Sequence, residues 1–195
     1  MRQTKFALLL VLISATIGFA GQPYNRSFAN RHDTSAVQTE AEWIKFTSPE
    51  GRFAVLLPRE PKFETLSATE SNQVTNYRYS ALESGYGFIC EYFDVASTGD
   101  DPQKLLDITR DGIITGAGAT LVGEEKISLN SYPGRELKLA FTVNNGAELT
   151  GRTRIYLVGK RLYSLTFLHM KSMEALRASD LGKKFFSSFE LKPAK

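Results

Sequence analysis

The side chains that most often carry acid–base or nucleophilic chemistry are scarce in this sequence. It contains two histidines, His32 and His169, and one cysteine, Cys90. His32 lies in a polar stretch without apolar periodicity, and His169 ends an apolar run, where a histidine is typically a surface or capping residue. The G-x-S-x-G motif of a nucleophile elbow does not occur. The sequence therefore predicts no catalytic residues, and hydrolysis through His169 is the weakest alternative.

The cysteine and the acidic residues do not predict a metal site. Cys90 has no second cysteine for a disulfide and no His, Lys or Arg within three positions to lower its pKa, so we expect a buried, inert thiol. Neither a C-x-x-C nor an H-x-E pattern is present. Asp94, Asp100 and Asp101 precede a predicted helix, where carboxylates usually cap the helix rather than bind calcium. We expect no metal and no cofactor.

Two other patterns suggest chemistry only weakly. The stretch Gly116–Gly123 resembles a phosphate loop, but leucine replaces the third glycine of G-x-G-x-x-G, and Glu124 and Glu125 would repel phosphate. Glu91 and Glu136 would form a glycosidase-like carboxylate pair if they faced each other across neighbouring strands. Acidic residues in strands more often lie on a solvated face.

Four basic residues form the candidate partner-binding site. Arg152 and Arg154 share one face of a predicted strand, and Lys160 and Arg161 lie on the adjoining turn. This spacing predicts a basic edge of the sheet. The simpler interpretation is a charged edge that discourages the addition of further strands. The alternative is contact with an acidic partner.

The first 20 residues are typical of an export signal. Arg2 and Lys5 precede the apolar run Phe6–Ile13, and small residues follow up to Ala20. The run is shorter than the roughly 20 residues that cross a bilayer, so we favour cleavage after about Ala20 over a retained membrane anchor. Residues 21–41 are polar and predict a flexible linker. The mature protein is expected to be periplasmic or extracellular, with no transmembrane segment.

Cleavage at this position also changes the charge of the working protein. It removes two of the 24 basic residues and none of the 21 acidic ones, so the formal net charge falls from +3 to +1. A nearly neutral chain has no broad electrostatic reason to bind nucleic acid or an anionic membrane. Because an intramolecular disulfide is impossible, the apolar core alone has to stabilise the fold.

Residues 42–192 predict a single α+β domain. Asp101 and Pro102 begin a helix that runs to about Ala117, and Gly116 and Gly118 close it. A second helix is expected from a cap at Ser172, although Gly182 weakens it and suggests two short pieces. The alternating segments predict strands near residues 42–48, 52–57, 65–68, 73–82, 86–95, 121–129, 137–143, 150–158 and 161–170.

This order of elements predicts the fold class. Consecutive hairpins with two inserted helices indicate an antiparallel sheet of about six to eight strands with helices packed on it. Sharp turns are predicted at Ser48–Gly51, Ser131–Gly134 and Asn144–Gly146. No period of 20 to 50 residues is visible, which argues against a repeat protein.

The segment Trp43–Pro58 resembles the opening of domains in the PsbP/Mog-like superfamily, which begin with an aromatic strand, a Pro/Gly turn and a second strand ending in proline. The later turn Tyr132–Arg135, the paired strands around Arg154–Leu157 and Leu162–Leu165, and the closing Phe185–Phe189 follow a similar order. The resemblance spans residues 42–191. It implies an α/β/α sandwich that serves as a protein-binding module.

The superfamily uses this module in different settings. Its extrinsic photosystem subunit binds a membrane complex, and its nuclear-transport member binds a small GTPase. This sequence has Arg59, Glu60 and Pro61 where the photosynthetic members tend to carry a tryptophan. This departure argues against a photosynthetic role, and no functional residue is carried over from the family.

These observations predict an exported, non-catalytic domain that binds a protein or an envelope component. One alternative is a carrier of a small apolar ligand. Its cleft would lie between the sheet and the helix at Asp101–Ala117, and would be lined by Phe53, Phe88, Tyr92 or Phe167.

Overall fold

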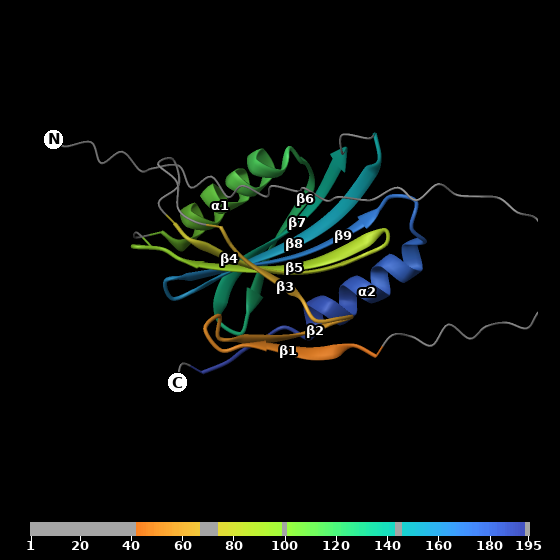
Figure 1. The fold of residues 1–195 in the computed structure, drawn as a ribbon. Helices are drawn as coiled ribbons and strands as arrows, with labels where there is room; N and C mark the ends of the chain where they lie inside the picture. Colours follow the sequence, from red (N-terminus) through yellow and green to blue (C-terminus); the bar gives the residue numbers. More distant parts are fainter. Residues whose placement is uncertain (1–41, 67–73, 99–100, 143–145, 194–195) are drawn as a thin grey trace, which may run out of the picture.

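The computed structural model describes residues 42–66, 74–98, 101–142 and 146–193. The predicted signal peptide at 1–20 and linker at 21–41 lie outside these residues. Figure 1 shows the order of the elements along the chain. They are β1 Ile44–Ser48, β2 Phe53–Leu57, β3 Lys62–Leu66, β4 Asn76–Glu83, β5 Tyr86–Asp94, α1 Pro102–Ala117, β6 Thr120–Leu129, β7 Tyr132–Thr142, β8 Glu148–Val158, β9 Arg161–Met170, α2 Ala175–Ser187 and β10 Glu190–Leu191.

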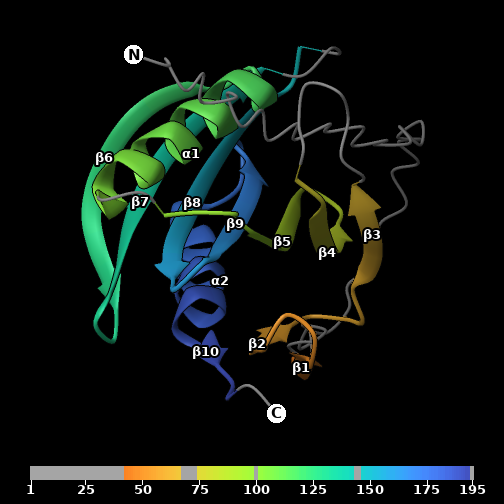
Figure 2. The same cartoon turned by 90° about the vertical axis from the view of Figure 1, so that its left-hand side faces the viewer.

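The strands form two antiparallel sheets. The large sheet has seven strands in the order β3-β4-β5-β9-β8-β7-β6, and the small sheet has three in the order β1-β2-β10. Figure 2 shows α1 on one face of the large sheet, and α2 with the small sheet on the other. The fold class is therefore α+β, as the sequence predicts.

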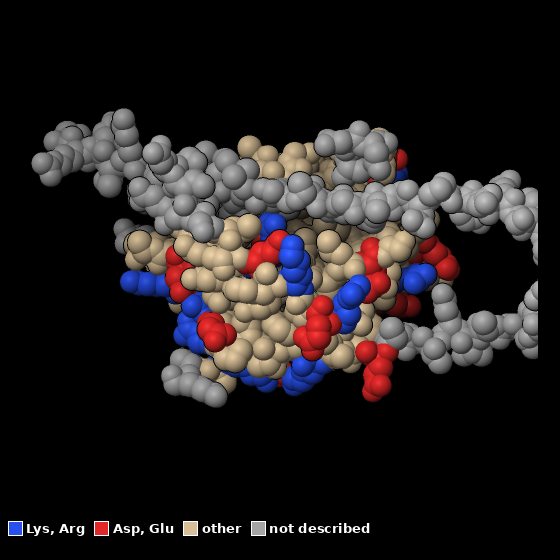
Figure 3. Space-filling view, viewed as in Figure 1, with Lys and Arg blue, Asp and Glu red and all other residues tan. Residues whose placement is uncertain are grey.

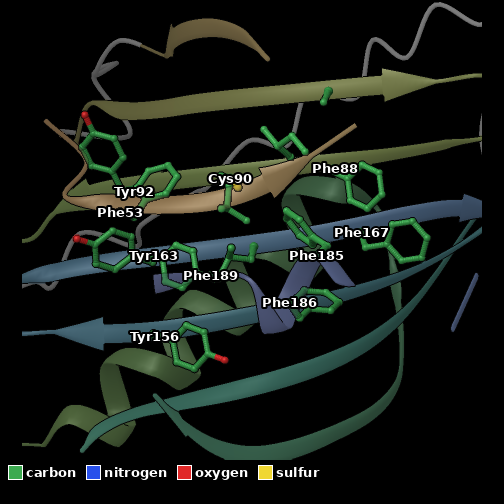
Figure 4. Packing of buried hydrophobic residues seen from close by; sticks show 14 of the residues in the cluster. Phe53, Phe88, Cys90, Tyr92, Tyr156, Tyr163, Phe167, Phe185, Phe186 and Phe189 are labelled. Carbon is green, nitrogen blue, oxygen red and sulfur yellow. The ribbon is translucent and has the colours of Figure 1, made fainter. Parts of the chain in front are cut away.

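Alternation along the strands divides the core into two layers. In β5, Phe88 and Tyr92 point toward α2 and the small sheet, whereas Phe93 points toward α1, because successive side chains of a strand lie on opposite faces. Figure 4 shows the layer beneath α2, which is rich in aromatic rings. The smaller layer consists of Phe93 and buried aliphatic residues of β7, β8 and β9, packed against Leu106 and Ile113 of α1.

The first helix has the boundaries that the sequence predicts. The Asp101 carboxylate accepts a hydrogen bond of 2.9 Å from the Gln103 N–H, and Pro102 occupies the first helical position. Gly118 ends the helix in the left-handed conformation, at φ 58°. That conformation favours glycine because it has no Cβ.

The second helix differs from the prediction in two ways. It begins at Ala175 rather than after Ser172, and the preceding Glu174 makes no side-chain capping bond. It also continues unbroken through Gly182. This glycine lies against the buried ring of Phe167, since a Cβ at position 182 would come within 3.2 Å of the ring. Gly182 therefore lets the helix approach β9 closely.

Two strand boundaries near prolines differ from the prediction. A strand is predicted near residues 65–68, but β3 starts at Lys62, directly after Pro61. The turn expected at Ser131–Gly134 lies at Asn130 and Ser131, and Pro133 belongs to β7. Pairing of β7 with β8 starts only at Gly134, so the missing N–H of Pro133 interrupts no hydrogen bond to β8.

In the part of the chain that the structure describes, neither helix combines the length and apolar character that a membrane crossing requires.

Candidate functional site

The structure places the four predicted basic residues at two separate locations. Arg152 and Arg154 lie in β8, whereas Lys160 and Arg161 lie at the turn into β9 and at its first residue. The expected basic edge is wrong, because β8 is an interior strand between β9 and β7. The edges of the large sheet are β3 and β6. Any contact of these arginines with a partner therefore involves the face of the sheet, not its edge.

Arg152 and Arg154 form a compact cluster with a carboxylate and an aromatic ring. Arg152 Nη2 donates to both oxygens of Glu136, at 3.0 and 2.9 Å, and Arg154 Nε donates to Glu136 Oε2 at 2.6 Å. Both guanidinium carbons lie over the ring of Phe186, at 5.1 and 4.7 Å from its centroid. We call these four residues the β8 arginine cluster.

Three elements position the β8 arginine cluster. Antiparallel pairing sets Glu136 of β7 directly opposite Arg154 of β8, and Arg152 lies two residues away on the same face. Phe186 comes from α2, which packs against this face of the sheet. The cluster therefore lies where the margin of α2 meets the sheet.

The charges of the cluster do not cancel. Burial by itself raises the pKa of the Glu136 carboxyl, but hydrogen bonds and charge from Arg152 and Arg154 outweigh it and leave the pKa below its ordinary value. Glu136 is thus ionised at neutral pH, and two guanidiniums share one negative charge. The arginine side chains are 32% and 27% exposed, whereas Glu136 is only 7% exposed. The surplus positive charge therefore reaches the surface.

Arg161 has a different environment. Its guanidinium donates to both oxygens of Asp94, at 2.6 and 2.7 Å, and to the Glu50 carbonyl at 2.6 Å, and it lies over the ring of Tyr92. It therefore fastens the β1–β2 turn to the large sheet. Lys160 is exposed on the turn before it, and its carbonyl accepts a hydrogen bond from the Val95 N–H.

The other residues considered for chemistry have separate environments. His169 Nδ1 lies 3.0 Å from the Met170 carbonyl oxygen, and its ring stacks on Phe167. Glu91 and Glu136 point to opposite faces of the large sheet, which overturns the carboxylate pair considered above. Within the described ranges, no three His, Cys, Asp or Glu side chains gather closely enough to hold a metal ion.

Cys90 is buried, as the sequence predicts. It belongs to the aromatic core layer and is 2% exposed. Burial raises the pKa of its thiol, and the charge of Glu91 raises it further. The thiol therefore stays protonated at neutral pH.

The aromatic residues proposed to line an apolar cleft are packed against one another. The rings of Phe88 and Phe167 are stacked with their centroids 5.0 Å apart, and the ring centroids of Phe53 and Tyr92 are 6.4 Å apart. All four residues belong to the layer beneath α2 and the small sheet, opposite α1. The predicted cleft between them and α1 is therefore wrong.

Sequence reasoning missed Glu136 and Phe186 as members of the cluster. The predicted turn at Asn144–Gly146 contained the signal for Glu136, because residues 136 and 154 lie equally far from position 145. Residues 143–145 themselves lie outside those that the structure describes. Phe186 had no comparable signal, since α2 and β8 meet only through tertiary packing.

Comparison with known proteins identifies the fold. No family model and no curated protein matches the sequence. Among solved structures, cyanobacterial PsbP from Synechocystis is similar with a TM-score of 0.52 at 14% identity, over 82% of this chain and 98% of that one. LpqN, involved in cell envelope biogenesis of Mycobacterium tuberculosis, gives 0.47 at 14% identity, over 72% and 83%. A Pseudomonas aeruginosa protein of unknown function gives 0.46 at 12%, over 77% and 98%.

The likeness to cyanobacterial PsbP extends over nearly the whole of that protein and agrees with the resemblance found in the sequence. At this identity it establishes architecture only. The protein has a PsbP-like fold.

Proposed function

We propose that this protein is an exported, non-catalytic binding domain, and that the β8 arginine cluster contacts an acidic segment of a partner protein. The observation that carries the proposal is the sharing of one buried carboxylate by two partly exposed guanidiniums. Glu136 fixes both arginines in place, so little side-chain entropy remains to be lost when a second carboxylate binds. Preorganised guanidinium groups are well suited to bind carboxylates.

The surroundings of the cluster favour a protein partner over a polyanion. Arginine beside an aromatic ring is typical of the residues that dominate protein–protein binding energy. Figure 3 shows a different face, on the side of β3 and β4, where basic and acidic side chains are intermingled and neither sign forms a continuous patch. Nucleic acid and anionic membranes bind best to extended basic surfaces.

The binding experiment compares the wild type with a neutralised cluster. In the triple variant Glu136→Gln/Arg152→Gln/Arg154→Gln, all three charges disappear together, so no unpaired charge remains beside Phe186. Pull-downs from the exported fraction with each protein as bait are then compared by mass spectrometry. We expect a partner that the wild type retains at 50 mM salt, releases at high salt and loses at least tenfold in the variant.

A matched control separates this effect from a general loss of charge. Lys62→Gln removes an exposed cation whose partner is Glu64 on β3, far from β8 in the sheet order. It should leave capture unchanged. Equal capture by the wild type and a folded triple variant would show that the cluster is not the binding surface.

Export rests on the leader sequence and has its own test. We expect the mature protein to begin at Gly21, which N-terminal sequencing of the exported fraction would show. Replacing Leu9 in the apolar run with Arg should retain the protein in the cell, because a charge there disrupts the run. An exported protein that still begins at Met1 would contradict the proposed cleavage.

A further inference from the structure

Of the two edge strands of the large sheet, β6 is the longer, and one of its sides faces away from β7. Among the residues that the structure describes, the ten residues of β6, Thr120–Leu129, pair only with β7, and most of them are exposed. Figure 2 shows β6 at the outer margin of the sheet. A register shift between Leu121 and Gly123 marks a bulge in the strand. The part of β6 that is regular enough to pair with another strand along its outer side therefore begins at Gly123.

One charged side chain of this edge has no counterion among the described residues. Glu124 accepts hydrogen bonds from Arg135 and Arg110, at 3.0 and 3.1 Å, and Glu125 accepts from Lys138 at 2.9 Å. Lys126 is exposed, and it makes no ion pair with any residue that the structure describes. Long edge strands with unpaired backbone groups are ready to pair with another strand.

We propose that β6 pairs with β6 of a second copy of this chain in an antiparallel, two-fold arrangement centred on Glu125. The two-fold axis of such a pair sets one residue opposite itself and places its neighbours opposite each other on the same face. With Glu125 on the axis, Glu124 lies opposite Lys126 of the second copy, and Lys126 lies opposite Glu124. The dimer therefore contains two reciprocal ion pairs.

Charge selects this register over its neighbours. With Lys126 on the axis, two lysines without counterions would meet. With Glu124 on the axis, two glutamates would meet and Lys126 would still lack an acidic partner. Glu125 tolerates the axis position, because each copy of it already pairs with its own Lys138. The paired stretch is residues 123–127, as long as the five-residue pairing of β3 with β4.

This inference is independent of the proposed function, because it involves an edge of the sheet and not the β8 arginine cluster. The contact is short, so we expect association in the micromolar range rather than a permanent dimer. It would join two large sheets into one continuous sheet.

Disulfide trapping tests the register directly. In Glu125→Cys, the two new thiols face each other across the axis at a distance that a disulfide spans, whereas those of Ser128→Cys lie far apart along the strands. Mild oxidation of the full-length protein at about 50 μM should crosslink most of the first variant and little of the second. Native Cys90 is buried and does not compete. A folded Glu125→Cys protein that fails to crosslink would overturn the proposal.

Reversal of charge tests the pairing without a crosslink. In Lys126→Glu, glutamates of the two copies lie opposite each other, and sedimentation equilibrium should show at least tenfold weaker dimerisation. Lys126→Arg keeps the charge and should stay within about twofold of the wild type. A wild-type protein that remains monomeric at 100 μM would overturn the proposal, as would equal dimerisation of both variants.

Discussion

A single carboxylate, that of Glu136, sets the charge balance and the orientation of the two arginines on β8. Without Glu136, two guanidiniums would lie over the same aromatic ring with like charges close together. With it, each arginine gains a charge-assisted hydrogen bond and a fixed orientation. Glu136 therefore supports both local stability and the proposed binding surface.

Substitution of Glu136 should be costly at neutral pH and less so in acid. We expect Glu136→Gln to lower the free energy of unfolding by about 2 kcal/mol at pH 7, because it leaves two partly buried cations without their anion. The folded state depresses the pKa of this carboxyl, so its stabilising effect is present above the ordinary value of about 4.3 and is lost as the pH falls through the lower folded-state value. Urea unfolding at pH 7 and about pH 3 measures both effects.

The neighbouring Glu125 provides the control for this substitution. Its side chain is 60% exposed and pairs with an exposed lysine, so Glu125→Gln should change stability by less than about 0.5 kcal/mol. If Glu136→Gln cost as little, or cost the same at both pH values, the ionised carboxylate would not stabilise the cluster.

For individual residues, the sequence predicts burial and the face of the sheet better than it predicts which side chains contact each other. It identified Arg152 and Arg154 as neighbours on one face, and it identified Cys90 as buried, because both follow from alternation along a strand. It did not reveal that Arg161 pairs with Asp94. That contact depends on the pairing of β5 with β9, two strands that are distant in the sequence.

Among the elements, the β6–β7–β8 hairpins depend on a close backbone approach. Gly134 of β7 lies so near β8 that a Cβ there would come within 2.4 Å of the Ile155 carbonyl oxygen and 2.6 Å of the Tyr156 ring. The backbone oxygen has no room to move inside a paired sheet. Gly134 therefore acts as a packing residue, whereas the sequence pattern suggested a turn.

A matched pair of glycine substitutions tests this interpretation. Gly134→Ala should lower the free energy of unfolding by about 3 kcal/mol, since the added methyl group has to displace backbone. Gly123→Ala in β6 should be neutral or slightly stabilising, because a Cβ there would meet only the Lys138 side chain at an ordinary 3.5 Å. Chemical denaturation measures both values. Similar effects of the two substitutions would show that close approach at Gly134 is unimportant.

Helix boundaries show why some elements are easier to predict than others. The first helix is specified locally, by a capping aspartate, a proline and a terminal glycine, and its predicted limits are confirmed. The second helix has no side-chain cap, so its start is set by packing of its apolar face on β2 and β9. Contacts of that kind are not visible in a single sequence.

In the whole molecule, one aromatic layer joins the two sheets. Phe53 of the small sheet is fully buried, and its ring lies near those of Tyr92 and Tyr163 of the large sheet and Phe189 after α2. The sequence predicted the α+β class and the small hairpin, because those depend on local alternation and turns. It did not predict that β10 joins β2, since that pairing brings together residues from the two ends of the domain.

A shared aromatic layer implies that the two sheets unfold together. Trp43 is the only tryptophan of the chain, and it packs edge-on against Phe88 at 5.1 Å, so its fluorescence reports on the layer between the sheets. Far-UV circular dichroism reports on the helices and strands of the whole domain, and most of its strand residues belong to the seven-stranded sheet. We expect the two signals to give the same urea midpoint, and Phe53→Ala to lower the free energy of unfolding by about 4 kcal/mol in both. The exposed Phe63 serves as control, and Phe63→Ala should cost less than about 1 kcal/mol. If the fluorescence of Trp43 changed at a lower urea concentration than the dichroism, the small sheet would be a separate unit attached to an independently stable large sheet.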